Sequence, residues 1–382
     1  MKVCLFGDAR SVHLRRLAAE LFARDVDVHI VTHKPAEVPG ATVERFAVPG
    51  ADWRNIRRWQ GRRRRYLSRF LERFDVVNIH FIVDWGFDRD SLEQSLEHGC
   101  LVASAWGSDL VPPPGETLPS DDERTARRDL LRAAQVVTAC GPAFAEVVAR
   151  FADLSPSDVQ VVPFGVDLEL FRPNRDSSEG TIGASHSVDA SGGGDASLIV
   201  GFHKGFRPVY GAKTLLDAIP LILSKHPVAR FEMIGDGPEL EECRAMAREA
   251  GVDRAIRWLP RMPHDAIPDA LRRWSVCVIP SVHEAFGVAA LEASATGIPV
   301  VASDVCGLRD TVQDGETGVL VPVADPPALA AAVVELLRDP ARCREMGRAG
   351  RSFVEREYDA NRVYDRWVRL YQDARERSLV MV

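Results

Sequence analysis

The stretch Val276–Ser303, VCVIPSVHEAFGVAALEASATGIPVVAS, holds the pattern that decides the fold. An apolar run ends at Pro280, a polar loop follows, a helix is expected to begin near Val288, and a second apolar run covers Pro299–Ala302. Both runs are too continuously apolar for strands with one face in water, which indicates a parallel sheet covered on both faces. The stretch therefore predicts a strand–helix–strand unit of an α/β protein.

The same alternation extends over most of the 382 residues. Before residue 174 the expected strands are Lys2–Phe6, Val26–Thr32, Val43–Val48, Asp75–His80, Leu101–Ala105, Val136–Ala139 and Val159–Pro163. After residue 197 they are Leu198–Gly201, Arg230–Ile234, Ile256–Leu259, Val276–Pro280, Pro299–Ala302 and Gly318–Val321. We therefore predict an α/β protein with two Rossmann-like, doubly wound domains, which we expect to face each other across a cleft.

Composition indicates where the domains begin and end. Residues 174–197 are rich in Ser, Gly and Asp and hold few large apolar side chains, so we interpret them as a flexible linker or insert. We expect residues 1–173 to form an N-terminal domain and residues 198–357 a C-terminal domain. Residues 358–382 carry an aromatic stripe and are expected to form a helix that packs back on the N-terminal domain.

Charge is distributed unevenly along the chain. The whole sequence has 48 Lys and Arg against 55 Asp and Glu, a net charge of -7, which argues against a general nucleic-acid binder. From Asp52 to Arg73, nine arginines stand against two acids, so this segment carries +7 and the remainder of the chain -14. The segment Arg54–Arg73 has three interpretations: a core helix with a solvated arginine face, a basic helix on an anionic membrane surface, or a patch that steers an anionic substrate.

Cysteine spacing and hydropathy indicate in which cellular compartment the protein is expected. The seven cysteines lie far apart without a C-x-x-C pair, and most stand in apolar runs, so we expect reduced core thiols. We expect no signal peptide and no membrane-spanning helix. We also expect no metal site, since no Cys/His set has the spacing of zinc ligands. The prediction is a cytoplasmic protein, with the arginine-rich segment as a candidate contact to the inner face of the cell membrane.

The loop and helix between the two apolar runs of the opening stretch carry the clearest chemistry. Gly287 lets the backbone approach a ligand closely, and the helix start offers the N–H groups of Gly287, Val288 and Ala289 to a phosphate. Glu292 can hold the vicinal hydroxyls of a ribose, and Glu284 the hydroxyls of a second sugar. The spacing alone fits a structural interpretation equally well, in which Glu284 favours the positive helix end and Glu292 is solvated.

Four ordered motifs resemble those of retaining glycosyltransferases of the large GT4 family, which have the GT-B fold. The E-x-F-G-x4-E signature of that family is matched by Glu284, Phe286, Gly287 and Glu292. Three further stretches are similar to family motifs in the expected order: VVPFGVDLELFRP (Val161–Pro173), MIGDGPEL (Met233–Leu240) and SDVCGLRDTVQDGETGVLVP (Ser303–Pro322). In these stretches Phe164 replaces a usual Asn, Cys306 a usual Gly and Asp310 a usual Glu.

The resemblance implies a metal-independent transferase that takes a sugar from a nucleoside-diphosphate sugar, with the acceptor on the N-terminal domain and the donor on the C-terminal domain. It implies that Lys204 and Arg207 hold the diphosphate and that Gly235 and Asp236 lie beside the nucleotide. It also implies front-face substitution with retention, in which the leaving phosphate helps to deprotonate the acceptor hydroxyl. UDP- and GDP-sugars both stay open, as do glycan, lipid-linked glycan and small-molecule acceptors, and no cofactor is expected.

The acceptor side departs from the family pattern. The loop after the first strand lacks the glycine pair common in relatives, and its polar side chains Asp8 and His13 are candidate acceptor contacts. Trp106 stands where related enzymes often place a His, so we expect it to pack or to stack on a sugar. His80, at the end of its strand, is the best remaining polar candidate for catalysis, with Asp109 next on the acceptor side.

Two other functions stay open at this point. A nucleotide-sugar epimerase of the same fold would convert the donor without an acceptor. A non-catalytic nucleotide-sugar-binding protein is suggested by Trp106 in the usual His position. Donor binding measured with and without sugar transfer distinguishes both from a glycosyltransferase.

Overall fold

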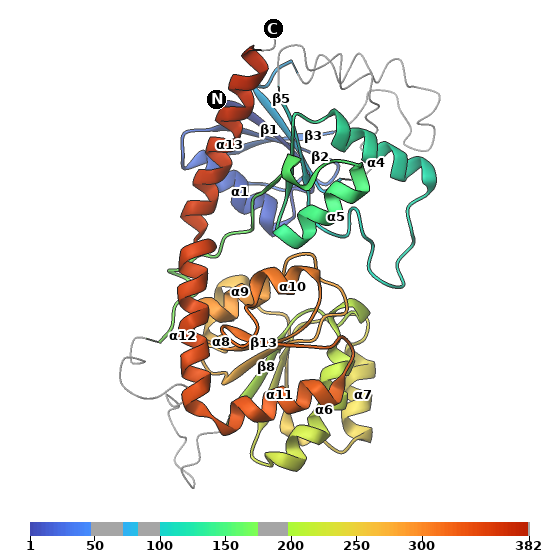
Figure 1. Cartoon of the computed structure of the whole chain (residues 1–382), viewed down its shortest axis with the longest axis vertical. Helices are drawn as coiled ribbons and strands as arrows, with labels where there is room; N and C mark the ends of the chain where they lie inside the picture. Colours follow the sequence, from blue (N-terminus) through green and yellow to red (C-terminus); the bar gives the residue numbers. More distant parts are fainter. Residues whose placement is uncertain (47–71, 83–99, 175–197, 381–382) are drawn as a thin grey trace. The chain divides into compact units, whose positions relative to one another are not determined.

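A computed structural model describes residues 1–46, 72–82, 100–174 and 198–380 of the chain (Figure 1). The chain divides into two compact units: the first comprises Met1–Phe164 and Asn361–Val382, and the second Gly165–Ala360. The expected linker and nearly all of the arginine-rich segment lie outside the described residues, so the interpretations of both stay predictions.

The first unit is built on a parallel sheet whose described strands have the order β3-β2-β1-β4-β5-β6-β7. The strands are β1 (Lys2–Phe6), β2 (Asp27–Thr32), β3 (Ala41–Arg45), β4 (Val76–His80), β5 (Cys100–Ala105), β6 (Val136–Ala139) and β7 (Val159–Val161). Every residue of β4, β5 and β6 is buried, which explains why these segments show no polar alternation.

The second unit repeats this architecture with the strand order β10-β9-β8-β11-β12-β13. Its strands are β8 (Ile199–His203), β9 (Arg230–Ile234), β10 (Ile256–Leu259), β11 (Val276–Ile279), β12 (Val300–Ser303) and β13 (Gly318–Val321), all paired in parallel. The predicted fold class is confirmed, and each expected strand is present. Strand ends differ from the expected ones by a few residues: β3 begins at Ala41 rather than Val43, and β8 ends at His203 rather than Gly201.

Helices connect the strands in both units (Figure 1). The first unit holds α1 (Val12–Phe22), α4 (Asp121–Ala133), α5 (Pro142–Ala152) and nearly all of α13 (Ala360–Val380). The second unit holds α6 (Ala212–Lys225), α7 (Leu240–Glu249), α8 (Ile267–Leu271), α9 (Val288–Ala295), α10 (Cys306–Thr311), α11 (Pro326–Arg338) and α12 (Pro340–Glu357). All seven cysteines are free, and six of them are buried, as expected of reduced core thiols.

The last helix, α13, is tied to the first sheet by a series of buried side-chain hydrogen bonds. Thr138 on β6 donates to Ser104 Oγ on β5 over 2.8 Å, and Ser104 donates to Asn78 Oδ1 on β4 over 2.8 Å. Asn78 Nδ2 then donates to the hydroxyl of Tyr371 on α13 over 2.7 Å. Burial raises the pKa of the Tyr371 phenol, which keeps it protonated as a partner for Asn78.

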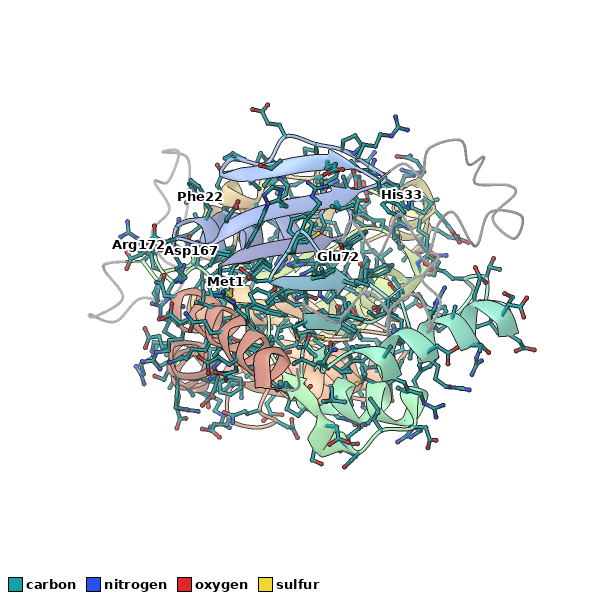
Figure 2. All side chains as sticks on the ribbon, turned by 90° about the horizontal axis from the view of Figure 1, so that it is seen from above. Met1, Phe22, His33, Glu72, Asp167 and Arg172 are labelled. Carbon is teal, nitrogen blue, oxygen red and sulfur yellow. The ribbon has the colours of Figure 1, made fainter. Side chains whose placement is uncertain are left out.

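Both sheets reverse their strand order at one point, next to the central strands. The chain adds strands on one side of β1 and then continues on its other side with β4, and it does the same around β8 with β11. In such sheets ligands bind beyond the carboxyl ends of the strands at this switch point. Figure 2 shows His33, just after β2, at these carboxyl ends of the first sheet, whereas Met1 and Phe22 lie at the amino ends.

Candidate functional site

The switch point of the second sheet brings together the strongest candidates from the sequence. Lys204 directly follows β8, and Glu284 lies in the loop after β11. Lys204 Nζ lies 2.5 Å from Glu284 Oε2, and the Ser281 hydroxyl donates to the same oxygen over 3.3 Å. Their side chains are only 13% and 16% exposed, so this ion pair is largely shielded from water.

Lys204 is held as a cation in spite of its burial. Burial opposes the charge, but the carboxylate of Glu284 together with Tyr210 outweighs burial and raises the pKa of Lys204. The ammonium lies 4.7 Å from the centre of the Tyr210 ring, which adds a cation–π contact. The site therefore offers a fixed positive charge, the type of group that stabilises a leaving diphosphate.

Glu292 lies on α9 between two histidines, an arrangement that the sequence motifs did not indicate. Its Oε1 atom lies 2.6 Å from His264 Nε2, and its Oε2 atom lies 3.5 Å from His203 Nε2. Burial alone would raise the pKa of Glu292, but the two histidines outweigh it and lower the pKa to about 2. The side chain is therefore a buried, ionised carboxylate and not the solvated one of the structural interpretation.

Helix α9 begins at Val288, as expected, and the backbone before it requires glycine. Gly287 has φ +99°, and a Cβ atom there would lie 2.7 Å from Leu308 Cδ2. Phe286 is buried against Tyr358, with ring centroids 5.7 Å apart, while Ala289 is buried in the helix. The E-x-F-G part of the motif thus combines one ion-paired side chain, one packing residue and one residue with a left-handed backbone.

A second close contact between backbone segments, at Gly235, holds the loop after β8 in place. Gly235 has φ +149°, and a Cβ atom there would lie 2.2 Å from the carbonyl oxygen of Lys204. The backbone carbonyl of Asp236 accepts a hydrogen bond from Phe206 N–H over 2.8 Å, and its side chain is exposed. The structure thus places Gly235 and Asp236 beside Lys204, and it leaves Arg207 exposed.

Helix α10, which follows β12, packs against the loop that holds Glu284, and Gly307 makes the contact. Its N–H donates to the carbonyl oxygen of Glu284 over 2.9 Å, and a Cβ atom at this position would lie 2.1 Å from Phe286 N. Only a residue without a side chain allows this approach. Cys306 stands where the family motif has a neighbouring glycine, and Gly307 is the residue that this packing requires.

The switch point of the first sheet holds the acceptor-side candidates. His13 on α1, His80 at the end of β4, Trp106 after β5 and Phe164 after β7 form a group that we call the aromatic cluster. The ring centroids of His13 and Phe164 lie 4.3 Å apart, those of Trp106 and Phe164 5.5 Å, and those of His80 and Trp106 5.1 Å. Asp8, the remaining candidate from the loop after β1, forms ion pairs with Arg10 and Lys34.

Asp109, an acceptor-side candidate from the sequence, is buried and surrounded by backbone N–H groups. It is 1% exposed, and its carboxylate accepts N–H bonds from Ile82 at 2.7 Å, from Trp106 at 3.1 Å and from Gly107 at 2.6 Å. Burial raises the pKa of Asp109 above its ordinary value, although these backbone donors act in the opposite direction. The side chain thus holds the segments after β4 and β5 together, and its burial leaves no surface for a sugar.

His264 and Phe164 are examples of residues at these sites that were not singled out from the sequence as site residues. His264 lies just beyond the carboxyl end of β10, which is the only sequence signal that could have identified it. Phe164 was noted only as a departure from a family motif, although it contacts two rings of the aromatic cluster. Among the described residues, no three or more His, Cys, Asp or Glu side chains group in a way that could hold a metal ion.

Comparisons with known protein families match both units. The family described as Glycosyl transferases group 1 matches residues 190–353, and Glycosyltransferase Family 4 matches residues 11–170. A D-inositol 3-phosphate glycosyltransferase from Acidothermus cellulolyticus is 33% identical over 320 residues, covering 79% of this chain and 67% of the relative. One of the same name from Kribbella flavida is 29% identical over 385 residues, covering 90% and 86%.

Solved structures share the fold at lower identity. Sucrose-phosphate synthase from Thermosynechococcus elongatus has a TM-score of 0.75 at 20% identity and covers 98% of each chain. Anabaena HepE in complex with UDP and glucose has a TM-score of 0.73 at 16% identity, covering 98% of this chain and 100% of that one. The chain therefore belongs to glycosyltransferase family 4 and is a nucleotide-sugar-dependent glycosyltransferase with the GT-B fold.

Proposed function

We propose that this enzyme transfers a sugar from a UDP-sugar to a hydroxyl group of a polyhydroxylated acceptor, with retention of configuration and without a metal ion. The observation that carries the proposal is the buried Lys204–Glu284 ion pair beside Glu292, at the switch point of the second sheet. It supplies a cation for the leaving diphosphate and two carboxylates for sugar hydroxyls in one place.

Each part of the donor has a separate partner in this proposal. Glu292, ionised between His203 and His264, accepts hydrogen bonds from the two ribose hydroxyls. Lys204 and the start of α9 hold the diphosphate, because a helix N-terminus and an ammonium both attract negative charge. Glu284 accepts hydrogen bonds from the transferred sugar, and its ion pair with Lys204 fixes both side chains for that task.

The choice of UDP and of acceptor is supported by the relatives. HepE, a structural neighbour, was solved with UDP and with UDP-glucose, which favours UDP over GDP as the nucleotide. The curated relatives are named D-inositol 3-phosphate glycosyltransferases, which supports a ring acceptor rich in hydroxyl groups. Front-face transfer needs the leaving phosphate to accept the acceptor proton, and Lys204 would stabilise the charge that remains on the diphosphate.

Calorimetry with fragments of the donor tests these assignments one group at a time. Glu292→Gln should weaken binding of uridine, UDP and UDP-glucose alike, because all three carry the ribose. Lys204→Met should weaken UDP and UDP-glucose but leave uridine unchanged. Glu284→Gln should weaken UDP-glucose more than UDP, because it acts on the sugar.

Lys213 offers a matched control for Lys204. It lies on α6 in ion pairs with Glu239 and Glu242, so Lys213→Met should leave all three affinities within twofold of the unsubstituted enzyme. Equal losses from Lys204→Met and Lys213→Met would contradict the diphosphate assignment. Consumption of UDP-glucose to an isomer without any acceptor would indicate an epimerase, and NMR of the product anomer decides between retention and inversion.

A further inference from the structure

His203 is the last residue of β8, the central strand at which the second sheet reverses its strand order. Its side chain is only 6% exposed, and its Nε2 atom is buried without a hydrogen-bond partner among the described residues. Nε2 lies 3.5 Å from Glu292 Oε2, which is longer than a normal hydrogen bond. Because leaving a buried ring nitrogen unpaired is unfavourable, its place at the carboxyl end of this strand indicates a partner that a ligand supplies.

The ring hydrogen of His203 is fixed on Nε2 by the groups on either side of the imidazole. Cys277 Sγ lies 3.8 Å from Nδ1, and burial raises the pKa of Cys277, so the thiol keeps its hydrogen and can donate it to Nδ1. On the other side, the carboxylate of Glu292 faces Nε2, where it attracts an N–H group and would repel a lone pair. Nε2 is therefore an N–H donor.

The two carboxylate oxygens of Glu292 are held unequally. His264 Nε2 lies 2.6 Å from Oε1, a short hydrogen bond, whereas 3.5 Å separates Oε2 from His203 Nε2. An ionised carboxylate has about four lone-pair sites, so Oε2 keeps its capacity to accept a hydrogen bond. Oε2 and the N–H of His203 thus form an acceptor and a donor that lie side by side in a buried place.

We propose that His203 is a further nucleotide-binding residue, and that one ribose hydroxyl both donates to Glu292 Oε2 and accepts from His203 Nε2–H. This inference rests on the proposed function, which assigns the ribose to Glu292, and it adds a second partner for one of the two hydroxyls. The pair also selects ribonucleotides, because a deoxyribose that lacks this hydroxyl would leave Oε2 and Nε2–H unpaired at once.

Among the groups of a nucleotide, a hydroxyl is the one that matches this donor and acceptor. A hydroxyl oxygen can donate one hydrogen bond and accept another. A phosphate oxygen could accept from the N–H of His203, but the carboxylate of Glu292 would repel it. An N–H group of the base could donate to Glu292, but it could not accept from His203 at the same atom.

The imidazole of His203 is supported from within the sheet, as a binding group requires. The centre of the fully buried Trp274 ring lies 5.6 Å from that of His203. Trp274 Nε1 in turn donates to Glu232 Oε2 over 2.8 Å, which holds the indole in place. Gly201 on β8 leaves the space for this indole, because a Cβ atom there would lie 1.8 Å from Trp274 Cδ2. The N–H of His203 is therefore presented in a fixed direction.

Calorimetry on the full chain with UDP, 2′-deoxy-UDP and 3′-deoxy-UDP measures what each ribose hydroxyl contributes. In the unsubstituted chain, loss of either hydroxyl should weaken binding about tenfold or more, because each pairs with the buried Glu292. In His203→Phe, which keeps a flat ring, the penalty for one of the two deoxy analogues should fall by about threefold or more, and the other penalty should stay unchanged. His203→Leu should behave in the same way, and His203→Gln, whose amide keeps an N–H donor, should restore part of the penalty.

His226→Phe is the matched control, because this histidine follows α6 and precedes β9, at the amino ends of the same strands. It should leave all three affinities unchanged. Equal weakening of all three ligands in His203→Phe and His203→Leu, with both penalties kept, is the result of a purely structural role and would overturn the proposal. An unsubstituted chain that binds UDP and both deoxy analogues equally would instead contradict the ribose assignment of Glu292 in the proposed function, and this inference with it.

Discussion

Gly307 allows α10 to pack directly on the backbone of the Glu284 loop, so its replacement by alanine should reshape the proposed donor site. In Gly307→Ala the new methyl group would lie 2.1 Å from Phe286 N, 2.2 Å from the carbonyl carbon of Ala285 and 2.4 Å from Phe286 Cα. All three are backbone atoms, so no side chain can rotate to make room. Either α10 or the loop has to move.

The size of the movement follows from the contact distances. Ordinary contacts of a Cβ atom begin near 3.4 Å, so the methyl group and the Phe286 backbone must separate by more than about 1 Å. The hydrogen bond from Gly307 N–H to Glu284, now 2.9 Å long, would be stretched or broken. A misplacement of about 1 Å in an active site can lower the rate about 100-fold, and overpacking costs about 1–3 kcal/mol of stability.

Steady-state transfer from UDP-glucose and urea unfolding measure these two effects separately. Gly307→Ala should lose about 100-fold in kcat/KM, whereas Gly205→Ala is the control, because a methyl group there would lie 3.4 Å from its nearest neighbour. The control should keep kcat/KM within about threefold and stability within about 0.5 kcal/mol. A Gly307→Ala enzyme with activity equal to the control would refute the reasoning.

Three further outcomes are expected. Tyr371→Phe should lower the free energy of unfolding by about 1–3 kcal/mol in urea titrations, because it leaves Asn78 Nδ2 unpaired. Since the pKa of Glu292 is about 2 in the folded chain against an ordinary 4.5, its stabilising effect is complete above about pH 4.5 and is lost as the pH falls toward 2. The difference in unfolding free energy between the unsubstituted chain and Glu292→Gln should therefore shrink over that window by about 3 kcal/mol. If the segment Arg54–Arg73 contacts anionic lipid, co-sedimentation should be stronger with anionic than with neutral vesicles, and equal binding to both would contradict this.

The grouping of the proposed donor residues was predictable because most of them follow one another closely along the chain. Glu284, Gly287 and Glu292 lie within one strand–loop–helix segment, and the periods of the apolar runs placed that segment at the carboxyl end of a parallel strand. Lys204 follows another strand of the same sheet. Local pattern and strand order were thus sufficient to bring these four residues to one edge of the sheet.

The partners of these residues were less accessible to sequence reasoning. His264 reaches Glu292 from the loop after β10, at the edge of the sheet, and no spacing links the two residues. Asp109 was predicted as an acceptor-side candidate, and its burial was not predictable because it depends on N–H groups from other segments. The ring contacts of Phe164 join the end of β7 to α1, and such contacts arise only from the folded arrangement.

The hydrogen bond between Asn78 and Tyr371 bears on how this chain folds as it is synthesised. The first unit needs α13, which is synthesised only after the whole of the second unit, a continuous segment, Gly165–Ala360. The second unit can therefore complete its core while the first still lacks its final helix, the reverse of the usual N-terminal-first order. Until Tyr371 is synthesised, Asn78 Nδ2 at the centre of the first sheet lacks the acceptor that it has in the folded chain.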